Sequence, residues 1–252
     1  MGSFNKKRLE AIKGKGIYIT TKDDRKILDG CSGAGVSCIG HGNKRVTNAI
    51  TKQNKTGITY LSSSWDNQVV HELCTNLKKG TGNVMVKVYL LNSGSEAIEA
   101  AIKLAFSYHC ENNEMKRINI IARKGSYHGA TLTALALSGY YARKKFYLDI
   151  LRHNNNIYYV SPCYSYREQI EGESNADFVK RKALELEQKI IEIGPDTVMA
   201  FILEPIVGAA LGCATFVPGY LEAVKKVCVK YGVVLIFDEI MCGMGRSGTL
   251  HT

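Results

Sequence analysis

From Asn67 onward, short apolar runs alternate with longer segments whose apolar residues recur every three to four positions. The short runs are typical of strands and the periodic segments of helices. The predicted strands are Val84–Leu91, Ile118–Ala122, Ile157–Val160, Val198–Leu203 and Val233–Phe237. The predicted helices are Asn67–Lys79, Glu96–Tyr108, Thr131–Leu137, Phe178–Ile193 and Tyr220–Lys230. This alternation indicates a parallel sheet with helices on both faces, and the unbroken apolar run Val233–Phe237 predicts a strand buried on both faces.

The N-terminal part of the sequence has a different pattern. The segments Ile17–Thr20 and Lys26–Asp29 flank the polar residues Asp23–Arg25, which predicts a hairpin. Val46–Lys52 predicts a short helix. The composition changes near Thr56–Ser64, so we place a domain boundary there, between residues 1–58 and 59–252.

Composition narrows the class of protein. With 252 residues, 45% hydrophobic and 22% charged, the chain is typical of a soluble globular protein. The net charge of +10 raises the question of a nucleic acid or membrane partner. No nucleic-acid-binding motif accompanies the basic residues, and most are scattered, so we expect solvated surface and neither partner, with a smaller anion such as phosphate or carboxylate as the alternative. The short basic clusters are Lys6–Arg8, Arg143–Lys145 and Lys180–Lys182.

The eight cysteines form no CxxC pair and have no zinc-ligand spacing, so we expect reduced thiols and no metal site. Reduced thiols fit a reducing compartment. The N-terminus has no apolar stretch of the secretory kind, and no apolar run reaches membrane-spanning length. We therefore expect a cytoplasmic protein, with a mitochondrial location as the alternative.

Ligands of an open parallel sheet bind beyond the carboxyl ends of its strands. After the first predicted strand of this region, Asn92–Glu96 opens a helix. Free backbone N–H groups and the helix dipole favour an anion at such a place, Gly94 permits close approach, and Ser95 adds a hydroxyl. The segment thus predicts either a phosphate cradle or an ordinary serine N-cap.

Acidic residues follow two further strands: Glu204 and Asp238. Carboxylates at the ends of buried strands are costly unless they meet a cation, a donor or a metal. They therefore indicate a shared polar site, with capping of the following turns as the alternative. Tyr127 and His128 come after a third strand, where an aromatic ring can stack on a flat ligand or simply pack.

Two motifs suggest other functions. Val233–Glu239 is similar to the Mg²⁺-binding strand of nucleoside triphosphatases, but the chain has no GxxxxGK[ST] loop. Gly243–Gly248 matches GxGxxG, but the helix and acidic residue of a dinucleotide site do not follow it. We interpret the second motif as a loop.

Taken in order, several segments resemble the class III aminotransferases. They are Gly14–Tyr18, Ile27–Asp29, Ile39–Gly42, Asn92–Ala97, Ser126–Thr131, Glu204–Ile206, Leu235–Ile240 and Gly243–Arg246. The resemblance implies a fold type I transferase that depends on pyridoxal 5′-phosphate. In such a fold, residues 59–252 form part of the large cofactor-binding domain, a mostly parallel sheet flanked by helices, and residues 1–58 form part of the small domain.

The resemblance also implies roles for individual residues. Gly94 and Ser95 hold the cofactor phosphate. Around the pyridine ring, Tyr127 stacks on one face with His128 beside it, Ile240 packs on the opposite face, and Asp238 pairs with the ring nitrogen. Glu204 lies near cofactor and substrate, and Tyr60 and Trp65 line the substrate pocket. Many relatives have a polar residue at the position of Met241, and Met cannot donate the same hydrogen bond to the ring hydroxyl.

The lysine that binds the cofactor in this family follows the Asp238 strand at a distance that lies beyond Thr252, and neither Lys124 nor Lys225 is at the matching place. We therefore expect a longer parent enzyme, a homodimer that moves an amino group from an amine or amino acid to a 2-oxo acid, and a present chain that does not turn over. The alternatives are a non-catalytic homologue that acts as a binding or dimerisation partner, and a related isomerase or decarboxylase. The sequence does not select among the amine substrates of the family.

Overall fold

The structure is a computed structural model that describes residues 8–58, 60–62, 64–152 and 155–252. The chain divides into two compact units, an N-terminal unit that extends to Val88 and a sheet unit, Tyr89–Thr252. This division falls later in the sequence than the boundary predicted at residues 58/59. The predicted boundary concerns the domains of the longer family fold and stays a prediction.

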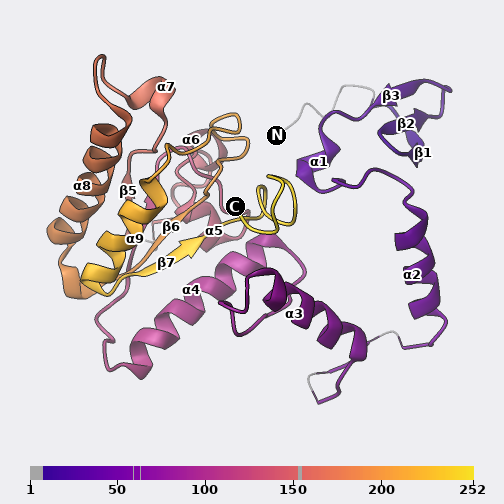
Figure 1. The fold of residues 1–252 in the computed structure, drawn as a ribbon, viewed down its shortest axis with the longest axis horizontal. Coiled ribbons are helices and arrows are strands. Elements are labelled where there is room, and N and C mark those ends of the chain that lie inside the picture. The colour runs from indigo at the N-terminus through magenta and orange to yellow at the C-terminus, as the bar shows by residue number, and fades with distance from the viewer. Residues whose placement is uncertain (1–7, 59, 63, 153–154) are drawn as a thin grey trace. The chain divides into compact units, whose positions relative to one another are not determined.

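The N-terminal unit contains a small antiparallel sheet in the order β1-β2-β3 and three helices (Figure 1). The elements are β1 (Ala11–Lys15), β2 (Tyr18–Thr21), β3 (Lys26–Leu28), α1 (Ser32–Gly35), α2 (Lys44–Asn54) and α3 (Gln68–Gly80). The predicted hairpin is confirmed as β2 and β3, and its turn is closed by a hydrogen bond of 3.0 Å from the Thr21 amide to the Arg25 carbonyl. Asn43 and Asn67 cap α2 and α3 by accepting hydrogen bonds from the first-turn amides.

The sheet unit contains four parallel strands in the order β5-β4-β6-β7. The strands are β4 (Asn119–Arg123), β5 (Ile157–Val160), β6 (Val198–Leu203) and β7 (Val234–Phe237). The helices are α4 (Gly94–Glu111), α5 (Leu132–Leu137), α6 (Tyr141–Lys144), α7 (Ser165–Glu168), α8 (Asn175–Ile193), the 3₁₀ helix η1 (Pro195–Thr197) and α9 (Tyr220–Tyr231). The predicted α/β architecture is confirmed.

Strand β6 is the centre of the core, and all six of its residues are buried. One face of the sheet packs on α8 and α9, through residues such as Phe178 and Val224. The other face packs on α4 and α5, through residues such as Ile98 and Leu137. In Figure 1, α8 and α9 lie on one side of the strands and α4 on the other. Both faces of β6 are thus covered, as its continuous apolar sequence predicts.

The prediction of a strand at Val84–Leu91 is wrong. These residues form no strand and pair with no strand of the described chain, and most of their apolar side chains are exposed. The apolar pattern is compatible with a strand, yet a strand also requires a partner that satisfies its backbone groups.

The prediction that the β7 strand is buried on both faces is also wrong, because helices cover the faces of this edge strand only in part. Its residues are half-buried, and Phe237 is 41% exposed. Beside β7, a groove of about 810 Å³ runs between α4 and α9. No charged side chain lines it; the lining residues are Ala101, Leu104, Ala105, Tyr108, Cys228, Val229, Gly232, Val233, Val234, Leu235, Ile236 and Phe237.

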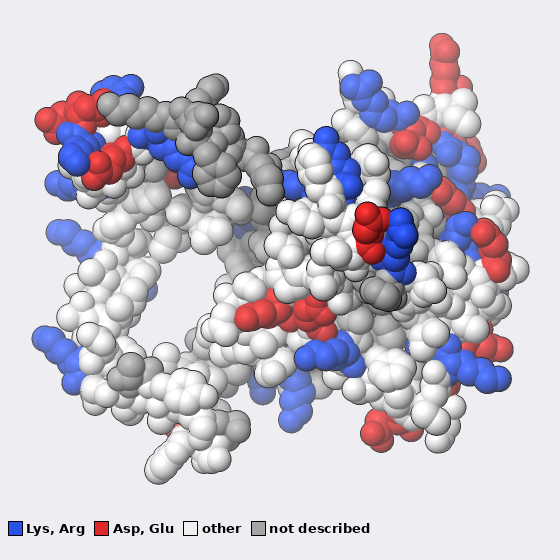
Figure 2. Space-filling model, turned by 180° about the vertical axis from the view of Figure 1, so that it is seen from behind, with Lys and Arg blue, Asp and Glu red and all other residues white. Residues whose placement is uncertain are grey.

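The charged surface is mixed. On the face drawn in Figure 2, Lys and Arg lie in small groups interspersed with Asp and Glu. The cluster at residues 180–182 is partly internal: Lys182 is buried and pairs with Glu168 at 3.2 Å, and Arg181 pairs with Glu173 at 2.7 Å. Our expectation of a solvated surface is therefore wrong for Lys182. None of the described helices is long and apolar enough to cross a membrane.

Candidate functional site at the carboxyl ends of the strands

The loop after β4 lies between the two predicted carboxylates. The backbone amide of Tyr127 donates to Glu204 Oε1 at 2.9 Å, and His128 Nδ1 lies 2.7 Å from Asp238 Oδ2. Glu204 follows β6 and Asp238 follows β7, so parallel strands bring their acidic ends to consecutive residues of one loop. The structure thus brings together four of the predicted site residues.

Glu204 is buried, and backbone amides surround its carboxylate. Its second oxygen, Oε2, accepts a hydrogen bond of 3.0 Å from the Gly208 amide. Burial raises the pKa of Glu204 above its ordinary value, while the hydrogen bonds from Gly208 and Tyr127 act in the opposite direction. The carboxylate is therefore held in a fixed orientation at the end of β6.

Asp238 is also buried, and it uses both oxygens. Oδ1 accepts from the Ile240 amide at 3.1 Å, and Oδ2 meets the His128 ring. Because an ionised carboxylate can only accept, Nδ1 of His128 carries the hydrogen in this contact. Nε2 of the same ring is buried and has no hydrogen-bond partner among the described residues. The Asp–His pair therefore has one ring nitrogen left for a further polar group.

The serine N-cap predicted for the Asn92–Glu96 segment is confirmed, and the phosphate cradle stays a prediction. Ser93 is the N-cap of α4, and its Oγ accepts from the Glu96 amide at 3.2 Å. Ser95 Oγ instead accepts from the Ala130 amide at 2.9 Å, which joins the start of α4 to the loop after β4. That contact leaves the Ser95 hydroxyl hydrogen for another acceptor. The Gly94 and Ser95 amides belong to the first helical turn, where intrahelical partners do not exist.

Gly94 lies directly against Ile240. A Cβ at position 94 would stand 2.8 Å from Ile240 Cδ1, so a side chain there would push the end of the Ile240 side chain away. In the loop after β4, the ring of Tyr127 is exposed, and the Arg143 guanidinium lies over it, 5.7 Å from the ring centroid. The two predicted stacking residues, Tyr127 and Ile240, thus both contact neighbours of the site and keep exposed side chains.

Tyr60 and Trp65 belong to the N-terminal unit and are 84% and 72% exposed. Their predicted place in a substrate pocket stays a prediction. Near Glu204, a Cβ on Gly208 would lie 3.0 Å from Met241 Cγ, so Met241 packs beside the glutamate loop.

The sequence predicted no role for four residues of the site: Arg123, Ser126, Ser138 and Gly139. Arg123 is the buried last residue of β4, and its guanidinium donates to the Glu204 carbonyl. Ser126 and Ser138 are buried and bind the same loop. A Ser-Gly pair directly after an apolar helix was the available sequence signal for positions 138 and 139.

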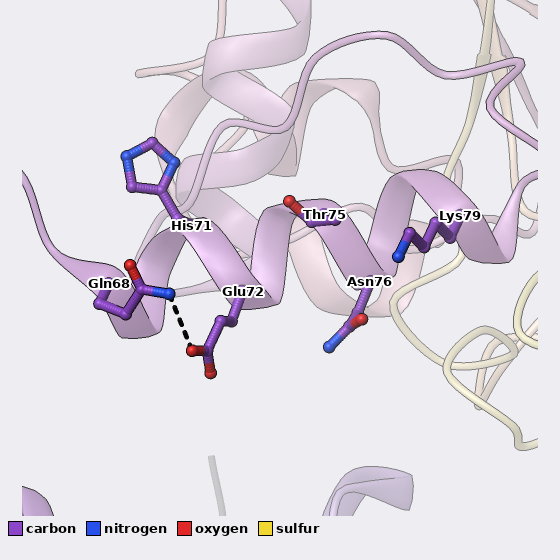
Figure 3. Close-up of a pocket in the computed structure, with 6 residues that line it drawn as sticks. All are labelled: Gln68, His71, Glu72, Thr75, Asn76 and Lys79. Carbon is purple, nitrogen blue, oxygen red and sulfur yellow. Dashed lines mark hydrogen bonds between the residues drawn. The ribbon is translucent and has the colours of Figure 1, made fainter.

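Another hollow lies on α3, in the N-terminal unit. Figure 3 shows that its lining side chains all project from this one helix: Gln68, His71, Glu72, Thr75, Asn76 and Lys79. His71 is an exposed residue bound to Asp66 at 2.6 Å, and Gln68 donates to Glu72 at 3.0 Å. These contacts are those of a solvated polar helix face, so we do not assign a site there.

Comparison with known proteins agrees with the geometry. A protein of Schizosaccharomyces pombe described as an uncharacterized aminotransferase is 42% identical over 240 residues, which are 95% of this chain and 52% of the relative. A solved transaminase obtained by ancestral reconstruction superposes with a TM-score of 0.90 at 32% identity, over 99% of this chain and 54% of the other. The omega transaminase of Pseudomonas jessenii, solved in complex with PMP, gives 0.86 at 30% identity, over 97% and 53%. The chain spans about half the length of the curated relatives it matches.

The family profile described as aminotransferase class-III matches residues 3–252, almost the whole sequence. Together with the parallel sheet and the paired strand-end carboxylates, this match shows that the chain belongs to the class III aminotransferase family.

Proposed function

We propose that the strand-end site binds pyridoxal 5′-phosphate, and that the longer protein transfers an amino group from an amine or amino acid to a 2-oxo acid. The observation that carries this proposal is the arrangement in which Glu204 and Asp238 hold adjacent residues of the loop that also meets Ser95. Class III aminotransferases depend on pyridoxal phosphate. For this chain, we propose which residues would hold the cofactor.

The residues present fit the chemistry of that cofactor. The phosphate suits the first-turn amides of α4 and the free hydroxyl hydrogen of Ser95. The flat ring suits the apolar surfaces of Tyr127 and Ile240. The close approach of Ile240 to Gly94 supports a shared cradle, because a side chain at position 94 would fill it. When bound, the cofactor supplies an electron sink for a carbanionic substrate.

Asp238 would hold a proton at the ring nitrogen. Its carboxylate is buried and already fixed by His128 and the Ile240 amide, so it needs little reorganisation to accept a hydrogen bond from a protonated nitrogen. His128 would orient this carboxylate, and Glu204 would orient Tyr127 through the backbone amide. The chain's own residues would thus bind the cofactor, position its ring and hold one proton at the ring nitrogen.

A proton at the reacting carbon requires a different group, the family's lysine, and no lysine of this sequence stands at the matching place. We expect the chain of 252 residues to bind the cofactor without turnover. Reduction with borohydride in the presence of pyridoxal phosphate, followed by peptide mass analysis, should give no adduct at a single specific lysine. A stoichiometric adduct at one lysine, together with transaminase activity, would contradict this expectation.

Binding itself can be tested by titrating the chain with pyridoxal phosphate and following absorbance. Replacing Asp238 by Asn removes the negative charge, and we expect affinity to fall about tenfold or more. Asp196→Asn is the matched control, because Asp196 is an exposed residue of η1 outside the site. Equal affinities of the wild-type chain and the Asp238 variant would overturn the assignment of Asp238.

A second function, a non-catalytic binding or dimerisation partner, is favoured by the uncharged groove beside β7. An unpaired strand edge between apolar helix surfaces is suited to adding a strand from another chain. Sedimentation of the chain alone tests this function, because a chain that stays monomeric at micromolar concentration would count against a dimerisation partner of this kind.

A further inference from the structure

Two buried serines join the loop after β4 to the turn after α5. Ser126 Oγ donates to the Arg123 carbonyl at 2.7 Å and accepts from the Gly139 amide at 3.0 Å. Ser138 Oγ donates to the Ala134 carbonyl at 2.8 Å and accepts from the His128 amide at 2.8 Å. The connections cross, since the loop serine binds the turn and the turn serine binds the loop. We call Ser126, Ser138 and Gly139 the serine clasp.

Gly139 makes the clasp rigid. Its backbone lies so close to the end of β4 that a Cβ would stand 2.1 Å from the Arg123 carbonyl oxygen and 2.7 Å from Lys124 Cα. The Gly125 amide donates to the Gly139 carbonyl at 3.1 Å, and Lys124 and Gly139 form an isolated parallel bridge. Because the obstructing atoms are backbone, neither side can move away without breaking the strand end.

The clasp surrounds the two residues that the carboxylates bind. Tyr127 lies between Ser126 and His128, and each of these neighbours is fixed by a buried hydroxyl. The Tyr127 amide then meets Glu204, and the His128 ring meets Asp238. The strand end itself is tied to β6, because the Arg123 guanidinium donates to the Glu204 carbonyl. The serine clasp therefore fixes the position from which the loop places Tyr127 and His128 against the two carboxylates.

A plain packing role accounts for only part of this network. Serine near a helix end often donates to the carbonyl four residues earlier, as Ser138 does with Ala134. Packing gives no reason for the second bond, from His128, or for the reciprocal bond of Ser126 with Gly139. Serine is seldom fully buried, and both of these hydroxyls are buried with donor and acceptor used.

We infer that Ser126 and Ser138 are positioning residues that hold Tyr127 and His128 against Glu204 and Asp238. The identity of the ligand that the loop meets rests on the proposed function. The contacts of Ser126 and Ser138 with the loop do not depend on that function. Loss of either hydroxyl frees the loop on one side, so the ring of His128 loses its fixed contact with Asp238 while the sheet stays intact.

The first test is the NMR spectrum of the 252-residue chain. The Nδ1–H proton of His128 should give a resolved low-field resonance in the wild-type chain, and the His128 and Gly139 amides should exchange slowly with solvent. Ser138→Ala should broaden or shift the ring resonance and speed exchange of the His128 amide by about tenfold. Ser126→Ala should do the same for the Gly139 amide, and Ser138→Thr, which keeps the hydroxyl, should restore the ring resonance.

The control is Ser107→Ala, since Ser107 is an exposed residue of α4. The inference is overturned if both alanine variants keep the ring resonance and the amide protection of the wild-type chain. It is also overturned if these two amides exchange freely in the wild-type chain, a measurement that needs no variant.

A second arm separates this inference from the proposed function. If the wild-type chain binds pyridoxal phosphate, Ser138→Ala should weaken binding by about tenfold, while Ser107→Ala should not. If the wild-type chain does not bind it, the proposed function of this chain fails, and the NMR result alone decides for or against the clasp.

Discussion

The two compact units differ in how they bury apolar side chains. Among the described residues, every buried hydrophobic side chain lies in the sheet unit, where helices cover both faces of four strands. Of the N-terminal residues that the structure describes, only Thr21 is buried, and apolar residues such as Val70 and Leu73 of α3 are exposed. The described part of the N-terminal unit has capped helices and a closed hairpin turn, but its described residues form no buried hydrophobic cluster. Local signals thus suffice to form elements, whereas a core needs layers that cover each other.

The largest expected effect follows from truncating the core of the sheet unit. Phe201→Ala removes a fully buried side chain of β6 and should lower the free energy of unfolding by ~3–5 kcal/mol. Val70→Ala on the exposed side of α3 should change it by less than about 0.5 kcal/mol. Urea unfolding followed by circular dichroism measures both. Similar losses of unfolding free energy in the two variants would show that Val70 belongs to a buried core, contrary to the difference between the units described above.

Hydrogen exchange should separate the units without any mutation. Amides of β6 should exchange only by global unfolding, because they are buried and paired on both sides. Amides of α2 and α3 should exchange by local opening, since these helices bury no residue. Mass spectrometry of peptides from deuterated protein gives the rates. Equal protection of α3 and β6 would contradict the distinction.

The groove beside β7 is the part of the sheet unit where apolar side chains are not fully buried. Leu104 and Val229 are exposed on opposite sides of it, from α4 and α9. We expect the wild-type chain to self-associate through this edge and the double variant Leu104→Glu, Val229→Glu to be more monomeric, because charges oppose burial there. Leu184→Glu, on an exposed position of α8, is the control. Sedimentation velocity over a range of concentrations tests this, and a wild-type chain that stays monomeric would contradict it.

The smallest effect concerns the pH dependence contributed by Glu204. Burial raises the pKa of this carboxyl in the folded chain, so its contribution to stability is complete below the ordinary value of 4.5 and decreases as pH rises through the folded value. Glu204→Gln does not titrate, and the stability of the wild-type chain relative to it should fall with rising pH. Urea midpoints from pH 4 to pH 8 measure the difference. A difference that grows with pH would contradict the sign.

Sequence reasoning identified most of the sheet unit, because its strands are continuous apolar runs and its helices have clear periodicity. It also identified Glu204 and Asp238, since an acidic residue after an apolar strand is conspicuous. It failed at Val84–Leu91, where the pattern was right for a strand but the partner was not available among the described residues. It failed at β7 for a related reason, because a strand's sequence shows apolarity but not which strands flank it.

The serine clasp shows the limit most clearly. Nothing in the sequence indicates what the hydroxyls of Ser126 and Ser138 bind, and their importance arises from burial and from hydrogen bonds that span ten and thirteen positions of the chain. Lys182 is similar, since a basic residue among basic neighbours gives no sign that it is buried beside Glu168.

The sequence by itself determined the family, the alternation of strands and helices, and the residue types at the strand ends, because these depend on local pattern and on the order of motifs. The tertiary structure decided which strand lies at the sheet edge, which serine caps α4 and which binds the neighbouring loop, and how Tyr127 and His128 come to lie against two carboxylates. The physical reason is that pairing, burial and hydrogen-bond satisfaction depend on segments far apart in the chain, which only the folded arrangement brings into contact.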